Sequence, residues 1–240
     1  MKKFIKKIIR NLGYEVHRYI PGSSSSAQII SSFRKFDIDL VLDIGANTGQ
    51  FGSELRGGGY QGEIISYEPL SSAHAELVRN SSNDSAWQVY PRCALGDHIG
   101  EAIINIAANS ASSSLLPMLG SHLDAAPYTK YVGSEAAPLL TLDSVALDKV
   151  VRFKNPFIKI DTQGFEWRVL DGSVQVLSYA RGLLLELSLV RLYDDQHLWR
   201  QVIERLEQSG FNLWAIQPEF ISPNDGRTLQ VNGIFFRGEF

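Results

Sequence analysis

The sequence has few of the features that mark membrane-spanning, disulfide-bonded or metal-cluster proteins. It contains one cysteine, Cys93, among 240 residues, which excludes an internal disulfide and a thiolate zinc cluster. No apolar run approaches the roughly 20 residues that a transmembrane helix requires. The net charge of −3 argues against a globally basic binder of DNA or RNA, so we expect no nucleic-acid partner. Nothing points to an oxidising compartment, and we expect a cytoplasmic protein.

Charge is distributed unevenly along the chain. Residues 1–20 hold six basic side chains and one acidic side chain, a net charge of +5, which leaves −8 for the other 220 residues. Phe4, Ile5, Ile8, Ile9 and Leu12 recur at helical spacing and predict an amphipathic basic helix. Such a helix either lies on an anionic membrane surface or packs on its own domain, and we favour the second interpretation. A serine-rich link ends this segment, so we divide the chain into residues 1–26 and a domain over 27–240.

Apolar strands alternate with helical segments from residue 27 onward. This alternation predicts a parallel sheet with helices on both faces and right-handed crossovers. The last two strands, 211–216 and 229–236, are expected to form a hairpin that leaves one strand antiparallel. We also predict a hairpin between 94–95 and 102–106, and a long binding loop or lid over 109–133. The remaining strands are expected at 40–44, 63–68, 87–90, 157–161 and 182–187, and the helices at 27–36, 49–56, 69–80, 165–177 and 198–209.

A glycine-rich turn follows the first strand, at residues 43–49 (DIGANTG). The dinucleotide-binding pattern G-x-G-x-x-G fails here, because Asn47 and Gln50 stand at the second and third glycine positions. No phosphate-binding G-x-x-x-x-G-K-[ST] occurs either. Glu68 ends the second strand, where a carboxylate can accept hydrogen bonds from both hydroxyls of a ribose. An adenosine-containing ligand without a phosphate cradle points to S-adenosylmethionine.

The order and spacing of six motifs resemble the FkbM-type family of S-adenosylmethionine-dependent O-methyltransferases. These motifs are VLDIGANTGQFG, ISYEPL, CALGD, TLDSV, FIKIDTQGFEWRVLDG and LLLELSL, and they cover most of residues 40–190. The resemblance implies a Rossmann-like class I methyltransferase fold, with a seven-stranded, mostly parallel sheet whose last strand is antiparallel. This sequence departs from the family pattern at Gln163, where many members have glutamate.

The same resemblance assigns the cofactor-binding residues. Asp43, Gly45, Asn47 and Gly49 would surround the methionine part of the cofactor, and Glu68 would bind the ribose. We add the neighbouring Ala46 and Pro69, Ala94 near the adenine end, and Asp161 facing the reactive sulfonium.

Two acidic residues are expected to face the reacting groups. Asp161 ends the strand beside the first strand, and Glu186 ends the adjacent fifth strand. Methyl transfer to a hydroxyl needs aligned reactants and a base for the hydroxyl proton, and Asp161 is our first choice for that base or for orienting the acceptor hydroxyl. Alternatively, the two acids hold a divalent cation such as Mg²⁺, which we do not favour and for which we assign no metal ligands. They can also simply cap helices or bind backbone amides.

Among the five histidines, His122 and His197 are the ones that we expect to act in catalysis, and we include His122 among the catalytic residues. His122 lies in the serine-rich loop, which is expected at the acceptor entrance; an ordinary surface role is the alternative for both. Small polar side chains at 109–115 suit a sugar or polyol acceptor, because they donate and accept hydrogen bonds without filling space.

These observations predict an S-adenosylmethionine-dependent O-methyltransferase that acts on a hydroxyl of a sugar in a glycan, glycolipid or secondary metabolite. A nicotinamide-dependent sugar oxidoreductase is the first alternative. It is disfavoured by the failed dinucleotide pattern and because Tyr131 has no lysine four residues on. The second alternative is a non-catalytic scaffold apposed to a membrane through residues 1–20.

Overall fold

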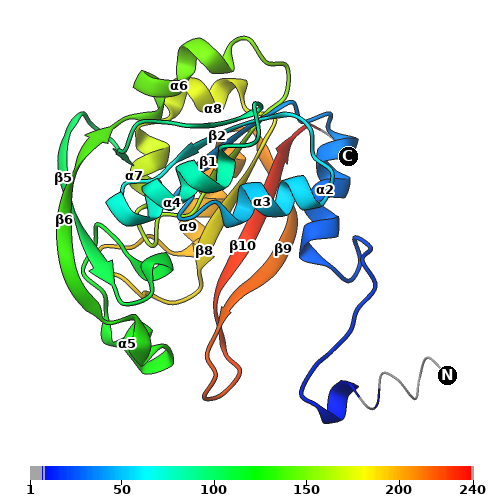
Figure 1. The fold of residues 1–240 in the computed structure, drawn as a ribbon, viewed down its shortest axis with the longest axis vertical. Coiled ribbons are helices and arrows are strands. Elements are labelled where there is room, and N and C mark those ends of the chain that lie inside the picture. Colours follow the sequence, from blue (N-terminus) through cyan, green and yellow to red (C-terminus); the bar gives the residue numbers. More distant parts are fainter. Residues whose placement is uncertain (1–6, 8, 239–240) are drawn as a thin grey trace.

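The computed structural model describes residues 7 and 9–238, and a seven-stranded sheet forms its centre (Figure 1). The strand order is β3-β2-β1-β7-β8-β10-β9. The strands are β1 (Leu40–Ile44), β2 (Glu63–Tyr67), β3 (Trp87–Val89), β7 (Pro156–Ile160), β8 (Gly182–Ser188), β9 (Phe211–Ile221) and β10 (Thr228–Arg237). Strands β3, β2, β1, β7 and β8 are parallel, whereas β10 is antiparallel to both β8 and β9. The predicted seven-stranded α/β sheet with an antiparallel last strand is therefore confirmed.

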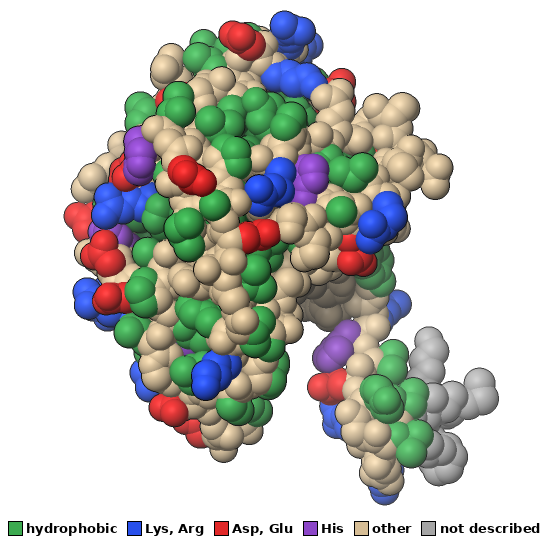
Figure 2. Space-filling view, turned by 60° about the vertical axis from the view of Figure 1, so that its left-hand side comes forward, with side chains coloured by type: hydrophobic (Ala, Val, Ile, Leu, Met, Phe, Trp, Pro, Cys, Tyr) green, Lys and Arg blue, Asp and Glu red, His purple; other side chains and the backbone are tan. Residues whose placement is uncertain are grey.

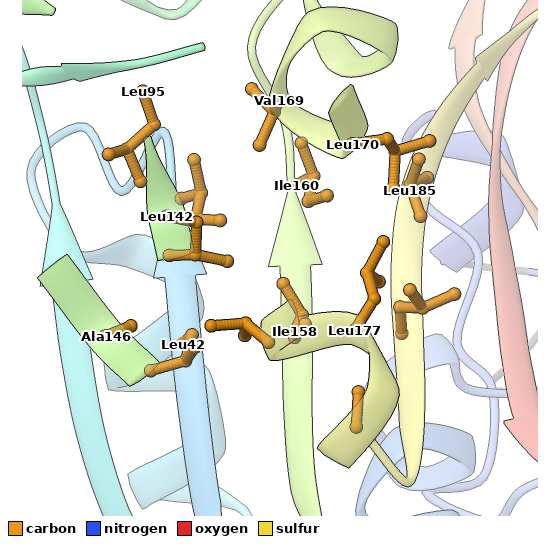
Figure 3. Packing of buried hydrophobic residues seen from close by; sticks show 14 of the residues in the cluster. Leu42, Leu95, Leu142, Ala146, Ile158, Ile160, Val169, Leu170, Leu177 and Leu185 are labelled. Carbon is orange, nitrogen blue, oxygen red and sulfur yellow. The ribbon is translucent and has the colours of Figure 1, made fainter. Parts of the chain in front are cut away.

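Helices cover both faces of this sheet and bury its apolar side chains. On one face lie α6 (Leu142–Val150), α7 (Glu166–Asp171), α8 (Val174–Tyr179) and α9 (Trp199–Gln208). Figure 3 shows leucine and isoleucine side chains of β1, β7 and β8 meeting those of α6, α7 and α8. On the other face lie α2 (Ser25–Lys35), α3 (Gln50–Gly57) and α4 (Ser71–Ser81).

The prediction of one helix over 165–177 is wrong, because the segment forms two helices, α7 and α8, which are separated by Gly172 and Ser173. A Cβ atom at Gly172 would lie 1.9 Å from the carbonyl oxygen of Gly96. The chain turns there so that the backbone of the β4 region can pass close by.

A second, three-stranded sheet replaces the predicted hairpin and part of the predicted loop. Its order is β4-β6-β5, with β4 (Ala94–Leu95), β5 (Gly100–Ala107) and β6 (Tyr131–Leu140). The hairpin prediction is wrong, because β4 and β5 both pair with β6 and not with each other. We missed β6 because its sequence, YVGSEAAPLL, carries Gly, Ala and Pro, and only Ala137 and Leu139 of it are buried. The segment before it is not one open loop, since it holds the 3₁₀ turns η1 (Ser110–Ser112) and η2 (Pro127–Thr129) and helix α5 (Gly120–Ala125).

The N-terminal segment stands apart from the rest of the protein (Figure 2). Leu12, Tyr14 and Tyr19 are 69%, 71% and 63% exposed in the described part of this segment, and packing of the predicted apolar stripe on the domain stays a prediction. Phe4, Ile5 and Ile8 of the predicted amphipathic helix lie outside the described residues. Within the described part of the chain, no helix has the length and apolar character needed to cross a bilayer.

Gly45 sets the close approach of β1 to β7, and its replacement tests this feature. Its φ of +73° is unfavourable for other residues, and a Cβ atom there would lie 1.8 Å from the carbonyl oxygen of Asp161. We expect Gly45→Ala to lower the free energy of unfolding by at least about 2 kcal/mol, measured by urea denaturation. Gly57→Ala is the control, because a Cβ at Gly57 meets no atom within 4 Å. Equal stability of the two variants would contradict the prediction.

Candidate functional site

A cavity of about 420 Å³ opens at the carboxyl ends of the central strands. Open α/β sheets bind their ligands at this edge, where the strand order reverses between β1 and β7. Seven of the predicted site residues line the cavity: Gly45, Ala46, Asn47, Glu68, Pro69, Ala94 and Asp161. Of the others, Asp43 is fully buried at the end of β1, Gly49 precedes α3, and Glu186 contacts the lining residue Gln163.

Glu68 lies at the end of β2 with its carboxylate fixed by the backbone. Its Oε2 accepts from the amide of Asn47 at 2.7 Å, and its Oε1 accepts from the amide of Leu70 at 2.9 Å. Each oxygen keeps a second lone pair for a ligand. Burial raises the pKa of Glu68 to about 7, and these two amides only partly offset that effect. The side chain therefore titrates near neutral pH.

Lys159 occupies the centre of the site, inside the apolar strand β7. Its Nζ donates to the carbonyl oxygen of Gly45 at 2.9 Å and lies 3.2 Å from Asp43 Oδ1 and 3.4 Å from Asp161 Oδ2. Burial by itself lowers the pKa of Lys159, but the carboxylates of Asp43 and Asp161 raise it above its ordinary value. The ammonium thus stays charged and joins the ends of β1 and β7.

The glycine-rich turn after β1 is hydrogen-bonded to the serine-rich segment at residues 109–115. Asn47 adopts a φ of +48°, and its Nδ2 donates to Ser110 Oγ at 3.2 Å. Ser110, Ala111, Ser113 and Leu115 line the cavity. The segment 109–115 therefore lies at the cavity beside the β1 turn, and its contact with an acceptor stays a prediction.

Gln163 links Asp161 to Glu186. Its Nε2 donates to Asp161 Oδ1 at 3.0 Å and to Glu186 Oε2 at 3.1 Å, while its Oε1 accepts from the Tyr193 hydroxyl at 2.8 Å. The backbone φ of +53° at Gln163 is held by Glu166, whose Oε1 accepts from the amides of Thr162 and Gly164 at 2.9 and 3.1 Å. The Asp161 side chain, 38% exposed, is thereby fixed facing the cavity.

Glu186 and Glu166 are buried acids close to Asp161. Burial, with the charges of Asp161 and Glu166, raises the pKa of Glu186 well above its ordinary value. Burial also raises the pKa of Glu166 to about 7. Both shifts disfavour the charged forms of these two acids, and of the three acids only Asp161 lines the cavity.

Neither of the two histidines chosen from the sequence is among the residues that line the cavity. His122 is buried and packs against the rings of Tyr193 and Phe220, and burial lowers its pKa to about 4. His197 stacks on Trp167 with ring centroids 4.0 Å apart.

Sequence reasoning gave Lys159 and Glu166 no role, although one signal was present. A lysine inside the apolar run FIKI must be paired when the strand is buried, and the acid of a neighbouring strand end is the available partner. The polar residues of β9 and β10 that line the cavity, Gln217, Glu219 and Asn232, were also missed. In the described ranges, 7 and 9–238, no three His, Cys, Asp or Glu side chains converge as metal ligands.

The sheet order, the antiparallel β10 and the cavity over the β1 turn, with an acid at the end of β2, define a Rossmann-like methyltransferase. Residues 43–213 match the family model described as the methyltransferase FkbM domain. The chain belongs to the FkbM methyltransferase family. Comparison with curated proteins gave no match.

Three solved structures are reported as similar to this chain. Magnesium protoporphyrin IX methyltransferase from Synechocystis PCC 6803 has 11% identity and a TM-score of 0.45, with 89% of this chain and 78% of that chain covered. Precorrin-6y C5,15-methyltransferase from Geobacter metallireducens has 13% identity and a TM-score of 0.45, with 89% and 87% covered. The Sp1610 protein from Streptococcus pneumoniae, in complex with S-adenosyl-L-methionine, has 13% identity and a TM-score of 0.47, with 89% and 73% covered.

The buried Lys159–Asp43 contact can be tested by removing one charge and then both. Lys159→Met leaves Asp43 buried without its cation, and we expect it to lower the free energy of unfolding by about 3–5 kcal/mol. Adding Asp43→Asn removes the unpaired charge and is expected to recover part of that loss. Urea denaturation measures both variants, with the exposed Lys154→Met as the control. A double variant less stable than Lys159→Met would contradict the expected coupling.

Proposed function

We propose that this FkbM-family methyltransferase binds S-adenosylmethionine in the cavity and transfers its methyl group to a hydroxyl, in a sugar or related polyol. The observation that carries the proposal is the joint placement of Glu68 and Asp161 on one cavity, at the ends of β2 and β7 on either side of the β1 turn. One acid suits a ribose, and the other suits a reacting hydroxyl.

The residues present fit this cofactor. Glu68 offers free lone pairs to ribose hydroxyls, and the absence of a side chain at Gly45 lets the β1 turn lie against Asp161. The residues that line the cavity include the apolar or aromatic Tyr67, Leu70, Cys93, Leu95 and Phe165, which suit an adenine ring. When bound, the cofactor supplies an electrophilic methyl group on a sulfonium.

Asp161 is the proposed base, or the group that orients the acceptor hydroxyl. Lys159 and Gln163 hold both of its oxygens, and the side chain still faces the cavity. An anchored carboxylate aligns a hydroxyl with the methyl group, and alignment supplies much of the rate enhancement in such displacements. The Gln163 amide donates to Asp161 and to Glu186, which holds both acids in place beside the cavity.

The nicotinamide alternative has less support. A dinucleotide needs room for a pyrophosphate against a helix N-terminus, and Asn47 and Gln50 stand where the dinucleotide pattern has glycines. A scaffold without turnover is the other alternative, and cofactor titration separates it from both enzymes.

Calorimetric titration with S-adenosylmethionine, S-adenosylhomocysteine and NAD⁺ tests the cofactor proposal. We expect micromolar binding of the first two and none of NAD⁺. Because the pKa of Glu68 is about 7, its ionised form decreases as the pH falls from 8 to 6, and we expect affinity to weaken several-fold over that range. Glu68→Gln should weaken binding at pH 8 about tenfold and remove most of the pH dependence.

Glu76→Gln, on the exposed side of α4, is the matched control and should bind as the unsubstituted protein does. Binding of NAD⁺ alone would overturn the methyltransferase proposal for this cavity. Binding of none of the three would favour the scaffold. Transfer of a labelled methyl group to sugars in a glycan or glycolipid extract then tests the acceptor class.

We propose further that residues 1–20 rest on an anionic membrane surface. Leu12, Tyr14 and Tyr19 are exposed in the described part of this segment, next to Arg10 and Arg18. Exposed aromatic and basic side chains on one segment suit the interface between water and lipid headgroups. This arrangement would hold the cavity close to a lipid-linked acceptor.

Vesicle co-sedimentation tests the membrane contact. We expect the protein to sediment with vesicles that contain phosphatidylserine, and much less with pure phosphatidylcholine or at high salt. Replacing Lys2, Lys3, Lys6 and Lys7 by Gln should reduce binding at least about tenfold, since each basic residue near the surface contributes about 1 kcal/mol. Lys130→Gln with Lys154→Gln is the control. Equal binding by both sets of variants would count against the proposal.

A further inference from the structure

Beyond Asp161 the cavity continues over β10 and β9, and this part, which we call the acceptor end, has a distinct lining. Asn232 of β10 pairs in register with Glu186 of β8 on one side and with Gln217 of β9 on the other. Side chains of paired residues point to the same face of a sheet. Leu184 and Ile234, two residues away on the same strands, pack in the cluster with α2 and α3, so this polar row faces those helices.

The other walls of the acceptor end come from helices on the same face. Ser25 and Ser26 of α2 and Phe51 and Glu54 of α3 line it. Gln217 Nε2 donates to the Ser25 carbonyl oxygen at 3.1 Å and to Gln28 Oε1 at 2.8 Å, which fixes α2 to β9.

The polar groups of the acceptor end are held in place by one another. Asn232 Nδ2 donates to Glu219 Oε2 at 2.7 Å, which leaves the Asn232 carbonyl oxygen and the other Glu219 oxygen for a ligand. Amide and carboxylate oxygens accept from hydroxyl donors, and the ring of Phe51 offers an apolar surface of the kind that packs against a sugar ring.

Negative charge dominates this part of the cavity. Glu54, Asp161 and Glu219 line it, whereas Lys159 is the one basic side chain among the described lining residues, and it is already shared between Asp43 and Asp161. Burial and the charge of Asp161 raise the pKa of Glu219, in agreement with a crowded acidic environment. An anion placed here meets like charges and finds no free cation among the described lining residues.

We propose that the acceptor end binds an uncharged, hydroxyl-rich sugar ring through Asn232, Glu219 and the serines of α2, and rejects rings that carry a phosphate or carboxylate. This inference rests on the proposed function, because it takes the reacting hydroxyl to lie at Asp161. The acceptor is then a neutral glycan or glycoside, and not a sugar phosphate, a nucleotide-linked sugar or a uronic acid.

Saturation-transfer NMR with three matched probes tests the charge selection on the full chain loaded with S-adenosylhomocysteine. The probes are methyl α-glucopyranoside, its uronate counterpart and glucose 6-phosphate. We expect the neutral glycoside to bind at least about tenfold more tightly than either anion. Glu219→Gln preserves shape and the bond from Asn232, and it should narrow that difference. Asn232→Leu should weaken the neutral probe about tenfold.

Two control substitutions are made at residues that do not line the cavity. Glu207→Gln on α9 and Asn212→Leu at the far end of β9 should leave all three affinities unchanged. Anionic probes that bind as tightly as the neutral one would overturn the proposal, and so would the absence of binding by all three. Failure to bind S-adenosylhomocysteine would instead overturn the proposed function, while the order of the probes on the unloaded protein still decides the charge selection.

Discussion

A buried lysine ammonium joins the two strands between which the strand order of the sheet reverses. Lys159 contacts the Gly45 carbonyl and the carboxylates of Asp43 and Asp161, so it connects the end of β1 to the end of β7. A buried charge without partners is strongly destabilising, whereas a well-bonded one restricts the geometry around it. The positions of both acids and of the Gly45 carbonyl therefore depend on this one side chain.

The Lys159 contacts also position the acids on the two sides of the cavity, Glu68 near β2 and Asp161 near β7. On the β2 side, the β1 turn offers the Asn47 amide to Glu68, so the same turn supports the acid proposed for the ribose. On the β7 side, one oxygen of Asp161 is held by Lys159 and the other by Gln163. Under the proposed function, Asp161 stands between Glu68, proposed to bind the cofactor ribose, and the acceptor end, where a transferred methyl group would pass.

The order of strands and helices was predictable because a strand that is buried on both faces of a sheet consists of consecutive apolar residues. The positions of Gly45 and Glu68 at the ends of β1 and β2 were predictable too, because each residue directly follows an apolar run in the sequence. Strand β6 was not, because its sequence shows little apolar alternation. The alignment of Glu186, Asn232 and Gln217 arises from pairing between strands distant in sequence, which no local pattern encodes. His122 seemed accessible in a polar segment, yet packing buries it between two rings.

Gln163 shows how one departure from the family pattern changes the electrostatics of the site. Its amide donates to Asp161 and Glu186 at once and accepts from Tyr193. A glutamate at this position would bring a third carboxyl group to the same point, and close like charges force one of the acids to keep a proton. The neutral amide removes that repulsion and instead donates to both acids. The Asp161 side chain is thereby fixed facing the cavity, and a group proposed to accept a hydroxyl proton must be held in such a position.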